Sequence, residues 1–207
     1  MTTPPGAPRK GRRHDPRVDR ALIAAAIEEL NESGYAAFTT AAVAQRAGAS
    51  TASLYRRWSS KHELTAAVTR QITLDELGDI DTGALDGDIR ELLTRKQRVL
   101  DAGAGPALLS LMGHAAHNPE LRRILHEEVY LATRARLAIV IDRASARGEI
   151  ESPIPATEID LLTLVLIGTG LARSVFTHDE ARGPDAPPAL DQLETELRLL
   201  IRTIRRQ

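Results

Sequence analysis

One stretch of the chain combines small hydroxyl side chains with a compact set of aromatic and cationic ones. From Gly48 to Leu64 it reads GASTASLYRRWSSKHEL and contains the only tryptophan of the chain. If residues Thr51 to Trp58 form a helix, Leu54 and Trp58 lie four residues apart on one face, where a hydrophobic core would cover them. The rest of this helix then presents small side chains at its N-terminal end and large polar ones at its C-terminal end.

This arrangement of small and large side chains suits the major groove of DNA. Short side chains at Thr51, Ala52 and Ser53 would let a helix approach base edges, where hydroxyls hydrogen-bond and a methyl group contacts a thymine methyl. Larger groups on either side would reach phosphates and fix the orientation of the helix. The candidates for these phosphate contacts are Tyr55, Arg56 or Arg57, and Lys61. The segment therefore predicts a helix that reads DNA.

The formal charge is distributed unevenly along the chain. The net charge is −1, but residues 1–61 carry +5 and residues 62–207 carry −6. A basic front on an acidic body indicates that only the front meets a polyanion, although uneven surface charge without a functional role is an alternative. Residues 1–15 are rich in Pro, Gly and Arg and predict a flexible basic arm. This arm either enters a minor groove or acts as a solubilising tail.

Composition limits the class of protein. Hydrophobic residues make up 43% of the 207 residues, aromatic residues only 3%, and cysteine is absent, so disulfides and thiolate metal sites are excluded. The longest apolar uncharged run, Leu161 to Ala172, has twelve residues, whereas a membrane span needs about 20. The N-terminal residues lack the apolar core of a secretory signal. The sequence predicts a cytoplasmic protein with no membrane segment.

The elements that would position the DNA-reading segment follow a helical period. Apolar residues recur at helical spacing from Leu22 to Leu30, Gly34 is a plausible stop, and Asn118 with Pro119 forms the clearest helix start. No segment alternates as a strand would. The pattern predicts an all-α fold of about nine helices, over residues 17–34, 41–47, 51–58, 60–78, 85–102, 106–116, 119–147, 157–177 and 189–206. The turn at Gly48, between two short helices, has the outline of a helix-turn-helix.

The last two predicted helices offer more apolar surface than one subunit readily covers. A seam with spacings of three and four runs along the final helix through Leu190, Leu193, Leu197, Leu200 and Ile204. The helix over residues 157–177 is apolar around most of its circumference and contains Gly168 and Gly170, where backbones approach closely. These features predict a homodimer through both helices, with packing inside one subunit as the alternative.

The segment from Arg20 to Val68 resembles the DNA-binding domain of TetR-family (tetracycline-repressor-like) regulators. The matching landmarks, in order, are Gly34-Tyr35, Phe38-Thr39-Thr40, Val43-Ala44, Arg46-Ala47-Gly48, Ser53-Leu54-Tyr55-Arg56-Arg57-Trp58 and Lys61. Any one of these is weak, but the ordered set over some fifty residues is specific. The rest of the chain resembles the family only in the number and order of its helices.

The resemblance implies a homodimeric transcriptional regulator. Residues 16–60 would form a three-helix DNA-binding domain, and residues 61–207 a ligand-binding and dimerisation domain that begins with a connecting helix, 61–78. Most members are repressors that a small molecule releases from a palindromic operator by moving the fourth helix. The DNA-binding residues expected on these grounds are Thr40, Ser50, Thr51, Ala52, Ser53, Tyr55, Arg56, Arg57 and Lys61. Ala41 departs from members that carry a longer, base-reading side chain there, which puts base readout from the second helix in doubt.

The residues of the ligand half give a weaker signal. Candidate pocket residues on three predicted helices are Leu108, Met112, His114, Tyr130, Arg134, Leu166 and Phe176. Tyr130 and Arg134, four apart, would bind an acidic or hydroxylated ligand or else form a surface pair. Leu64, Val68 and Ile72 are the expected coupling surface of the connecting helix.

Two rival classes remain open from the sequence. His114 and His117, with His126 and Glu127 further on, would make a metal-dependent enzyme conceivable, but their spacing is not the HExxH pattern of helical zinc sites. No nucleophile elbow, phosphate-binding glycine loop or dinucleotide fingerprint occurs, so no catalytic residue, metal or cofactor is expected. The other rival is a ligand-sensing adaptor that lacks sequence-specific DNA binding.

Overall fold

The structure is a computed structural model that describes residues 16–150, 152–176, 195–196, 198–200, 202 and 204. Within these ranges it consists of helices and connecting turns, with no strand, which confirms the all-α prediction. The elements in chain order are α1 (Pro16–Ala37), α2 (Thr40–Arg46), α3 (Thr51–Tyr55), α4 (Lys61–Leu77), α5 (Leu85–Val99), the π-helix η1 (Leu100–Ala104), α6 (Gly105–Ala115), α7 (Pro119–Leu125), the π-helix η2 (His126–Leu131), α8 (Ala132–Ala146) and α9 (Ala156–Phe176). None of the helices in the described ranges has the length and hydropathy that a bilayer crossing requires.

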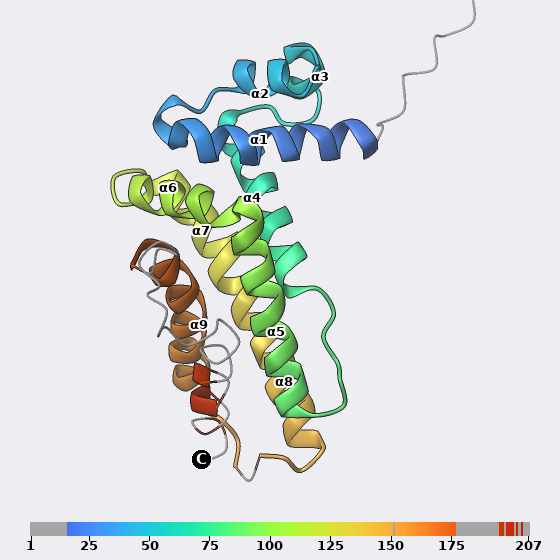
Figure 1. Cartoon of the computed structure of the whole chain (residues 1–207), viewed down its shortest axis with the longest axis vertical. Coiled ribbons are helices and arrows are strands. Elements are labelled where there is room, and N and C mark those ends of the chain that lie inside the picture. The colour runs from blue at the N-terminus through green and yellow to red at the C-terminus, as the bar shows by residue number, and fades with distance from the viewer. Residues whose placement is uncertain are drawn as a thin grey trace, which may run out of the picture.

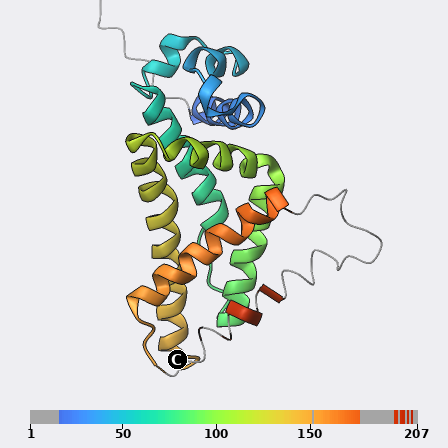
Figure 2. The same ribbon diagram turned by 90° about the vertical axis from the view of Figure 1, so that its left-hand side faces the viewer.

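The molecule is elongated, with α1, α2 and α3 grouped at one end (Figure 1). We call this group, residues 16–58, the head. Helix α4 leads away from the head and packs against α5, α7 and α8, while α6 crosses directly beneath α1 (Figures 1 and 2). One apolar cluster joins the head to α4, α6 and α7, and a second lies further down among α5, α8 and α9.

Side-chain caps set the starts of several short helices. Thr39 accepts a hydrogen bond from the Ala42 N–H, Ser50 from the Ser53 N–H, and Asn118 from the Leu121 N–H. Each cap satisfies a backbone donor that the first helical turn leaves unpaired. Helix α2 consequently begins at Thr40, one residue before its predicted start.

Two of the predicted helices are interrupted by π-helical segments. The prediction of one regular helix from residue 119 to 147 is wrong at η2, and the helix expected over 85–102 runs into η1. Gly103 in η1 adopts φ +103°, a conformation that a β-carbon opposes, and the chain turns there from α5 into α6. Segment η2 stays continuous with α7 and α8 but holds wider turns, and such π segments are frequent at functional sites.

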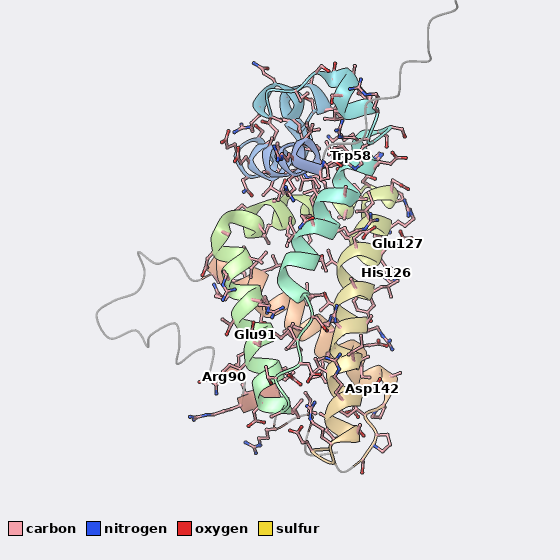
Figure 3. All side chains as sticks on the ribbon, turned by 90° about the vertical axis from the view of Figure 1, so that its right-hand side faces the viewer. Trp58, Arg90, Glu91, His126, Glu127 and Asp142 are labelled. Atoms are coloured by element: carbon pink, nitrogen blue, oxygen red, sulfur yellow. The ribbon has the colours of Figure 1, made fainter. Side chains whose placement is uncertain are left out.

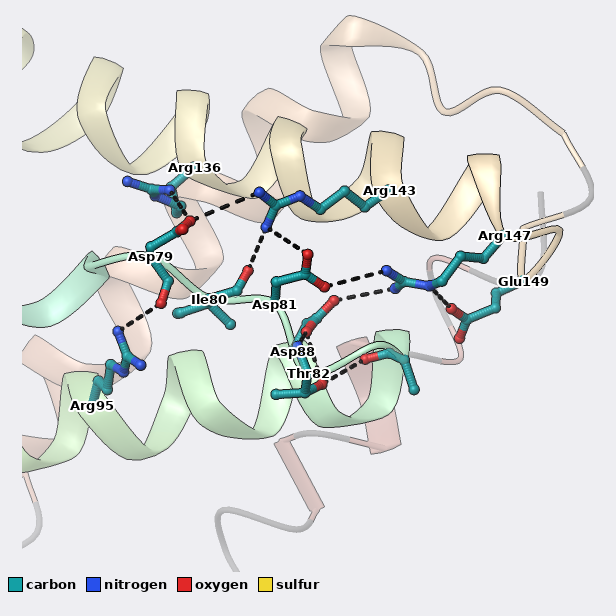
Figure 4. Close-up of polar contacts among 11 residues, drawn as sticks. Asp79, Ile80, Asp81, Thr82, Asp88, Arg95, Arg136, Arg143, Arg147 and Glu149 are labelled. Atoms are coloured by element: carbon teal, nitrogen blue, oxygen red, sulfur yellow. Dashed lines mark hydrogen bonds and ion pairs between the residues drawn. The ribbon is translucent and has the colours of Figure 1, made fainter.

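The connection between α4 and α5 is held by an ionic network (Figure 4). Asp88 is fully buried and accepts hydrogen bonds from the Thr82 N–H (2.6 Å), the Thr82 hydroxyl (2.8 Å) and Arg147 of α8 (3.1 Å). Arg143, also of α8, donates to the Ile80 carbonyl at 2.8 Å and lies 3.8 Å from the Asp79 carboxylate. The far end of α4 is therefore tied to α8.

The seam predicted for the final helix needs a correction. Leu190, Leu193 and Leu197 lie outside the described residues, whereas Leu200 and Ile204 are buried in the second cluster of their own chain. Because those two residues already pack beside Ile89 and Leu137, they do not face a partner subunit. Among the residues of this segment that the structure describes, Leu199 is the exposed large apolar side chain.

Candidate nucleic-acid interface and ligand cavity

Helix α3 is placed by the apolar side chains that the sequence assigned to the core. Leu54 and Val43 are fully buried, and Trp58 packs partly buried against the same cluster, close to where the head meets α4 (Figure 3). Gly48 has φ +62° in the turn before α3, a conformation suited to glycine. Thr51 and Ala52 are exposed as a result, so the N-terminal end of α3 presents small side chains to solvent.

Tyr55 and Thr40 lie together on the outer surface of the head. The Tyr55 hydroxyl is 2.9 Å from the Thr40 hydroxyl, and Tyr55 is 51% exposed. The contact joins the first turn of α2 to the last turn of α3. Two hydroxyls from different helices thus share one surface, next to exposed Arg56.

Arg57 differs sharply from its neighbour Arg56. Its side chain is only 8% exposed, forms an ion pair with Asp19 of α1, and donates 2.9 Å hydrogen bonds to the Ser53 carbonyl and hydroxyl. These contacts fix α3 against α1 and occupy the Ser53 hydroxyl as an acceptor. The expectation that Arg57 contacts phosphate is therefore dropped in favour of Arg56.

Arg46 is also committed to contacts inside the head. Its guanidinium donates to Glu29 at 3.0 Å and to Glu32 at 2.9 Å, and it lies 3.6 Å from Glu28. Glu29 is buried at this ion pair. Much of the positive charge of the head therefore holds α1, α2 and α3 together.

Lys61, at the start of α4, turns towards the head. Its ammonium donates to the Tyr35 carbonyl at 2.9 Å and lies 4.0 Å from the centre of the Tyr35 ring. Burial lowers the pKa of this ammonium group from its ordinary value. Lys61 thus joins α4 to the end of α1. It lies near Tyr55 in sequence, but its side chain is partly buried.

Substituting the two adjacent arginines should have opposite consequences. Arg56→Met should leave the free energy of unfolding unchanged. If Arg56 contacts one phosphate in each subunit of a dimer, as expected from the sequence, the variant should also reduce the slope of log K against log salt by about 2. Arg57→Met should lower the free energy of unfolding by about 2 kcal/mol, because Asp19 loses a charged partner. Chemical denaturation and salt-dependent DNA titrations of both variants measure the two effects. A reversed pattern would overturn the assignment.

A cavity of about 560 Å³ lies among η1, α6, α7, η2 and α9. Its lining is mostly apolar, with four polar side chains. The lining residues are Lys96, Leu100, Leu108, Met112, Arg122, Leu125, His126, Val129, Tyr130, Leu164, Ile167 and Leu171. Its volume lies within the range of about 300–1,000 Å³ that is typical of small-molecule sites.

Only three of the seven predicted pocket residues line this cavity. Leu108, Met112 and Tyr130 do so. His114 instead contacts the Tyr35 ring and bonds through Nδ1 to the Ser110 carbonyl oxygen, and Arg134 pairs with Asp160. The other two also lie elsewhere, since Leu166 belongs to the second apolar cluster and Phe176 is 82% exposed.

Apart from Tyr130, the sequence-based prediction missed the polar side chains of the cavity. Arg122, His126 and Tyr130 recur every fourth residue and lie along one side of α7 and η2, and this spacing was the available signal. His126 stacks on Tyr130 with 5.4 Å between ring centres, and Figure 3 shows it on that helix. Over the described ranges, no three His, Cys, Asp or Glu side chains gather as a metal site would need.

Two contacts join the walls of the cavity to the head and to α4. Arg70 of α4 donates from Nε to Glu128 of η2 at 2.8 Å, within the segment that also carries His126. On α6, the Ser110 hydroxyl accepts a hydrogen bond from the Tyr35 N–H at 2.8 Å, two residues from each of the cavity residues Leu108 and Met112 in the same helix. The expected coupling residues Leu64, Val68 and Ile72 are all buried in the cluster that joins the head to α4, α6 and α7.

Comparison with known proteins covers both parts of the chain. Residues 22–68 match the family model of bacterial regulatory proteins of the tetR family. Residues 79–193 match the model of the tetracyclin repressor-like C-terminal domain. The two matches together span the helix-turn-helix and most of the remaining chain.

Individual relatives agree with these models. The DNA-binding transcriptional repressor TetR of Mycobacteroides abscessus is 31% identical over 136 residues, which cover 63% of this chain and 72% of that protein. The HTH-type transcriptional regulator AqdR of Rhodococcus erythropolis is 27% identical over 190 residues, covering 92% and 87%. Among solved structures, GusR of Salmonella enterica superposes with a TM-score of 0.69 at 18% identity, covering 94% of this chain and 99% of that one. The chain therefore belongs to the TetR family of DNA-binding transcriptional regulators.

Proposed function

We propose that this regulator is a repressor that binds a palindromic operator as a homodimer and is released when a small molecule fills the cavity. The observation that carries the proposal is the cavity itself, whose walls contact both α4 and the head. The similarity to a protein described as a repressor supports the sign of regulation. The protein would act by binding alone, as members of this family generally do.

In this proposal residues 16–60 bind DNA and residues 61–207 bind ligand and partner. Exposed Thr51 and Ala52 would approach base edges, with Ser50 and Ser53 beside them. Tyr55, Arg56, Thr40 and Lys61 would contact the phosphate backbone. The small side chains of α3 favour a contribution from DNA shape to specificity.

The dimer would form through α9 and the final helical segment. The outer face of α9 carries exposed large apolar side chains, and Leu199 lies on the final segment. On α9 they are Leu161, Leu164, Val165, Val175 and Phe176. A β-carbon placed at Gly168 would meet nothing within 4 Å, so this part of α9 is open to close approach by a partner helix. An isologous contact here would relate the two heads by a two-fold axis.

Ligand release would follow from a change in head separation. The recognition helices of a dimer need a spacing of about 34–36 Å, one turn of DNA. A ligand that binds a different spacing about 100-fold more tightly supplies about 2.7 kcal/mol of coupling. In this chain the change would pass from η2 through Glu128 to Arg70 of α4.

Reversing either charge of the Arg70–Glu128 pair should weaken operator binding by about fivefold, or about 1 kcal/mol, because like charges would displace η2 from α4. Arg70→Glu and Glu128→Arg change the net charge in opposite directions, so a simple electrostatic effect would change affinity in opposite directions. The double exchange restores both the pair and the net charge and should restore affinity. Fluorescence anisotropy with operator DNA measures all three. Opposite effects of the two single variants would contradict this coupling route.

Selection of binding sites from a random duplex library, at low and near-physiological salt, tests the proposal. Enrichment of one inverted repeat that survives the higher salt would support specific binding by a two-fold dimer and would supply the operator. Loss of binding at the higher salt without an enriched motif would overturn it. The ligand-sensing adaptor would then become the better description.

A further inference from the structure

The two cationic side chains that line the cavity, Lys96 and Arg122, differ in whether a carboxylate is paired with them. Of these two, Lys96 already has a counter-charge: its ammonium lies 3.6 Å from the Glu196 carboxylate and donates to the Thr169 hydroxyl at 3.0 Å. The Lys96 side chain is only 6% exposed, so this pairing offsets its desolvation. Lys96 thus serves the packing of α5 against α9 and the C-terminal segment.

Arg122 lines the same cavity without a carboxylate partner in the part of the chain that the structure describes. Its Nε and Nη2 donate to the Ala115 and Ala116 carbonyls at 3.3 and 3.0 Å, which caps the end of α6. The nearby carboxylates are taken by the adjacent arginine, since Arg123 pairs with Glu120 and Glu127. Neutral carbonyls hold the exposed Arg122 guanidinium in place but supply no counter-charge, so its charge is available to an acidic ligand.

The groups that follow Arg122 extend the polar side of the cavity. His126 stacks on Tyr130 at 5.4 Å with an interplanar angle of 18°. Burial, with a hydrogen bond to the neighbouring Asp160 carboxylate, raises the pKa of the Tyr130 hydroxyl from its ordinary value, so the hydroxyl proton is held by Asp160 at neutral pH. One side of the cavity therefore offers a cation, an imidazole and a phenol ring, while the rest is apolar except for the paired Lys96.

We propose that the effector is an apolar molecule that carries one acidic group, a carboxylate or sulfonate, and that Arg122 binds this group. The inference rests on the proposed function, because it takes the cavity as the effector site. An uncharged apolar ligand would remove water from the guanidinium without replacing it, and a cation would be repelled. A strongly polar polyanion would leave the leucine, valine and isoleucine lining poorly filled.

Two fluorescent probes that differ by one acidic group test this assignment. They are 1-anilinonaphthalene-8-sulfonate and its uncharged parent N-phenyl-1-naphthylamine, titrated into the full-length protein. Arg122→Gln removes the charge and keeps an amide donor for the α6 carbonyls. Arg123→Gln is the matched control, since it makes the same change one residue away. Val129→Trp fills the cavity, and thermal unfolding shows whether each variant is folded.

The wild type should bind the sulfonate at least about tenfold more tightly than the parent. Arg122→Gln should remove about tenfold of sulfonate affinity, or about 1.4 kcal/mol, and leave the parent unchanged, while Arg123→Gln changes neither. Val129→Trp should abolish binding of both probes. If Arg122→Gln affects the two probes equally, or neither, the acidic-group assignment is overturned while the cavity keeps its role. If a folded Val129→Trp binds both normally, or if the wild type binds neither, the cavity loses its role and the proposed function loses its support.

Discussion

Tyr55→Ala is expected to weaken binding of the dimer to every duplex by about 100-fold. The side chain is half exposed, and its hydroxyl is 2.9 Å from that of Thr40, so its removal would delete the proposed phosphate contact without opening the core. A hydrogen bond to a charged group contributes about 1.5 kcal/mol, and two subunits together lose about 3 kcal/mol. Anisotropy titrations with operator and scrambled duplexes at two salt concentrations measure the loss.

Two further variants distinguish backbone contact by the Tyr55 hydroxyl from base reading by α3. Tyr55→Phe should reproduce most of the loss, because it removes only the hydroxyl. Thr51→Val should instead change the ratio of operator to scrambled affinity, since Thr51 lies at the base-reading end of α3. Ser53→Ala is a poorer choice there because the Ser53 hydroxyl also holds Arg57. Unchanged affinity of Tyr55→Ala for all duplexes would show that Tyr55 does not contact the backbone.

Asp88→Ala should lower the free energy of unfolding by about 3 kcal/mol and the unfolding midpoint by about 6–12 °C. Asp88 is fully buried and joins Thr82 of the α4–α5 connection to Arg147 at the end of α8, so its loss removes three hydrogen bonds, one of them from a charged group (Figure 4). Differential scanning calorimetry at neutral pH measures the shift. Asp86→Ala is the control: Asp86 is exposed in the first turn of the same helix, and we expect less than about 1 kcal/mol there.

The Asp88 carboxylate should also make the free energy of unfolding depend on pH. Burial alone would raise the pKa of Asp88, but hydrogen bonds from Thr82 and Arg147 outweigh it and lower the pKa below 3.8. On acidification the unfolded chain therefore binds this proton first. The stabilisation from Asp88 is complete above pH 3.8 and is lost as pH falls through the lower, folded value. Asp88→Ala should flatten the acid side of the stability curve, and an unchanged slope would contradict the pKa direction.

The head was largely predictable because its determinants are local. Helical spacing, the Ser50 cap and the glycine turn at Gly48 account for the helices of the head to within a few residues. The difference in burial between Arg56 and Arg57 was not predictable from neighbouring residues. Adjacent residues point about 100° apart on a helix, and the partner that buries Arg57 is Asp19, 38 positions away in sequence.

The cavity was less predictable for a related reason. On α9 the prediction selected Leu166, whereas Leu164 and Ile167 line the cavity. The prediction therefore assigned the wrong face of this helix to the cavity. On α7 and η2 the prediction selected Tyr130 but neither Arg122 nor His126, although the three recur every fourth residue. Spacing alone did not show which face of this helix meets α6 and α9.

The contacts of Tyr35 limit how the head is able to move. Its carbonyl accepts a hydrogen bond from Lys61 of α4, and its N–H donates one to Ser110 of α6. The head is therefore attached to two different helices at this one residue. Together with the apolar cluster that joins the head to α4, α6 and α7, these two attachments restrain the head from turning independently of either helix. In the proposed mechanism, a displacement of α4 relative to α6 would therefore reach the head at Tyr35 and would give its motion a definite direction.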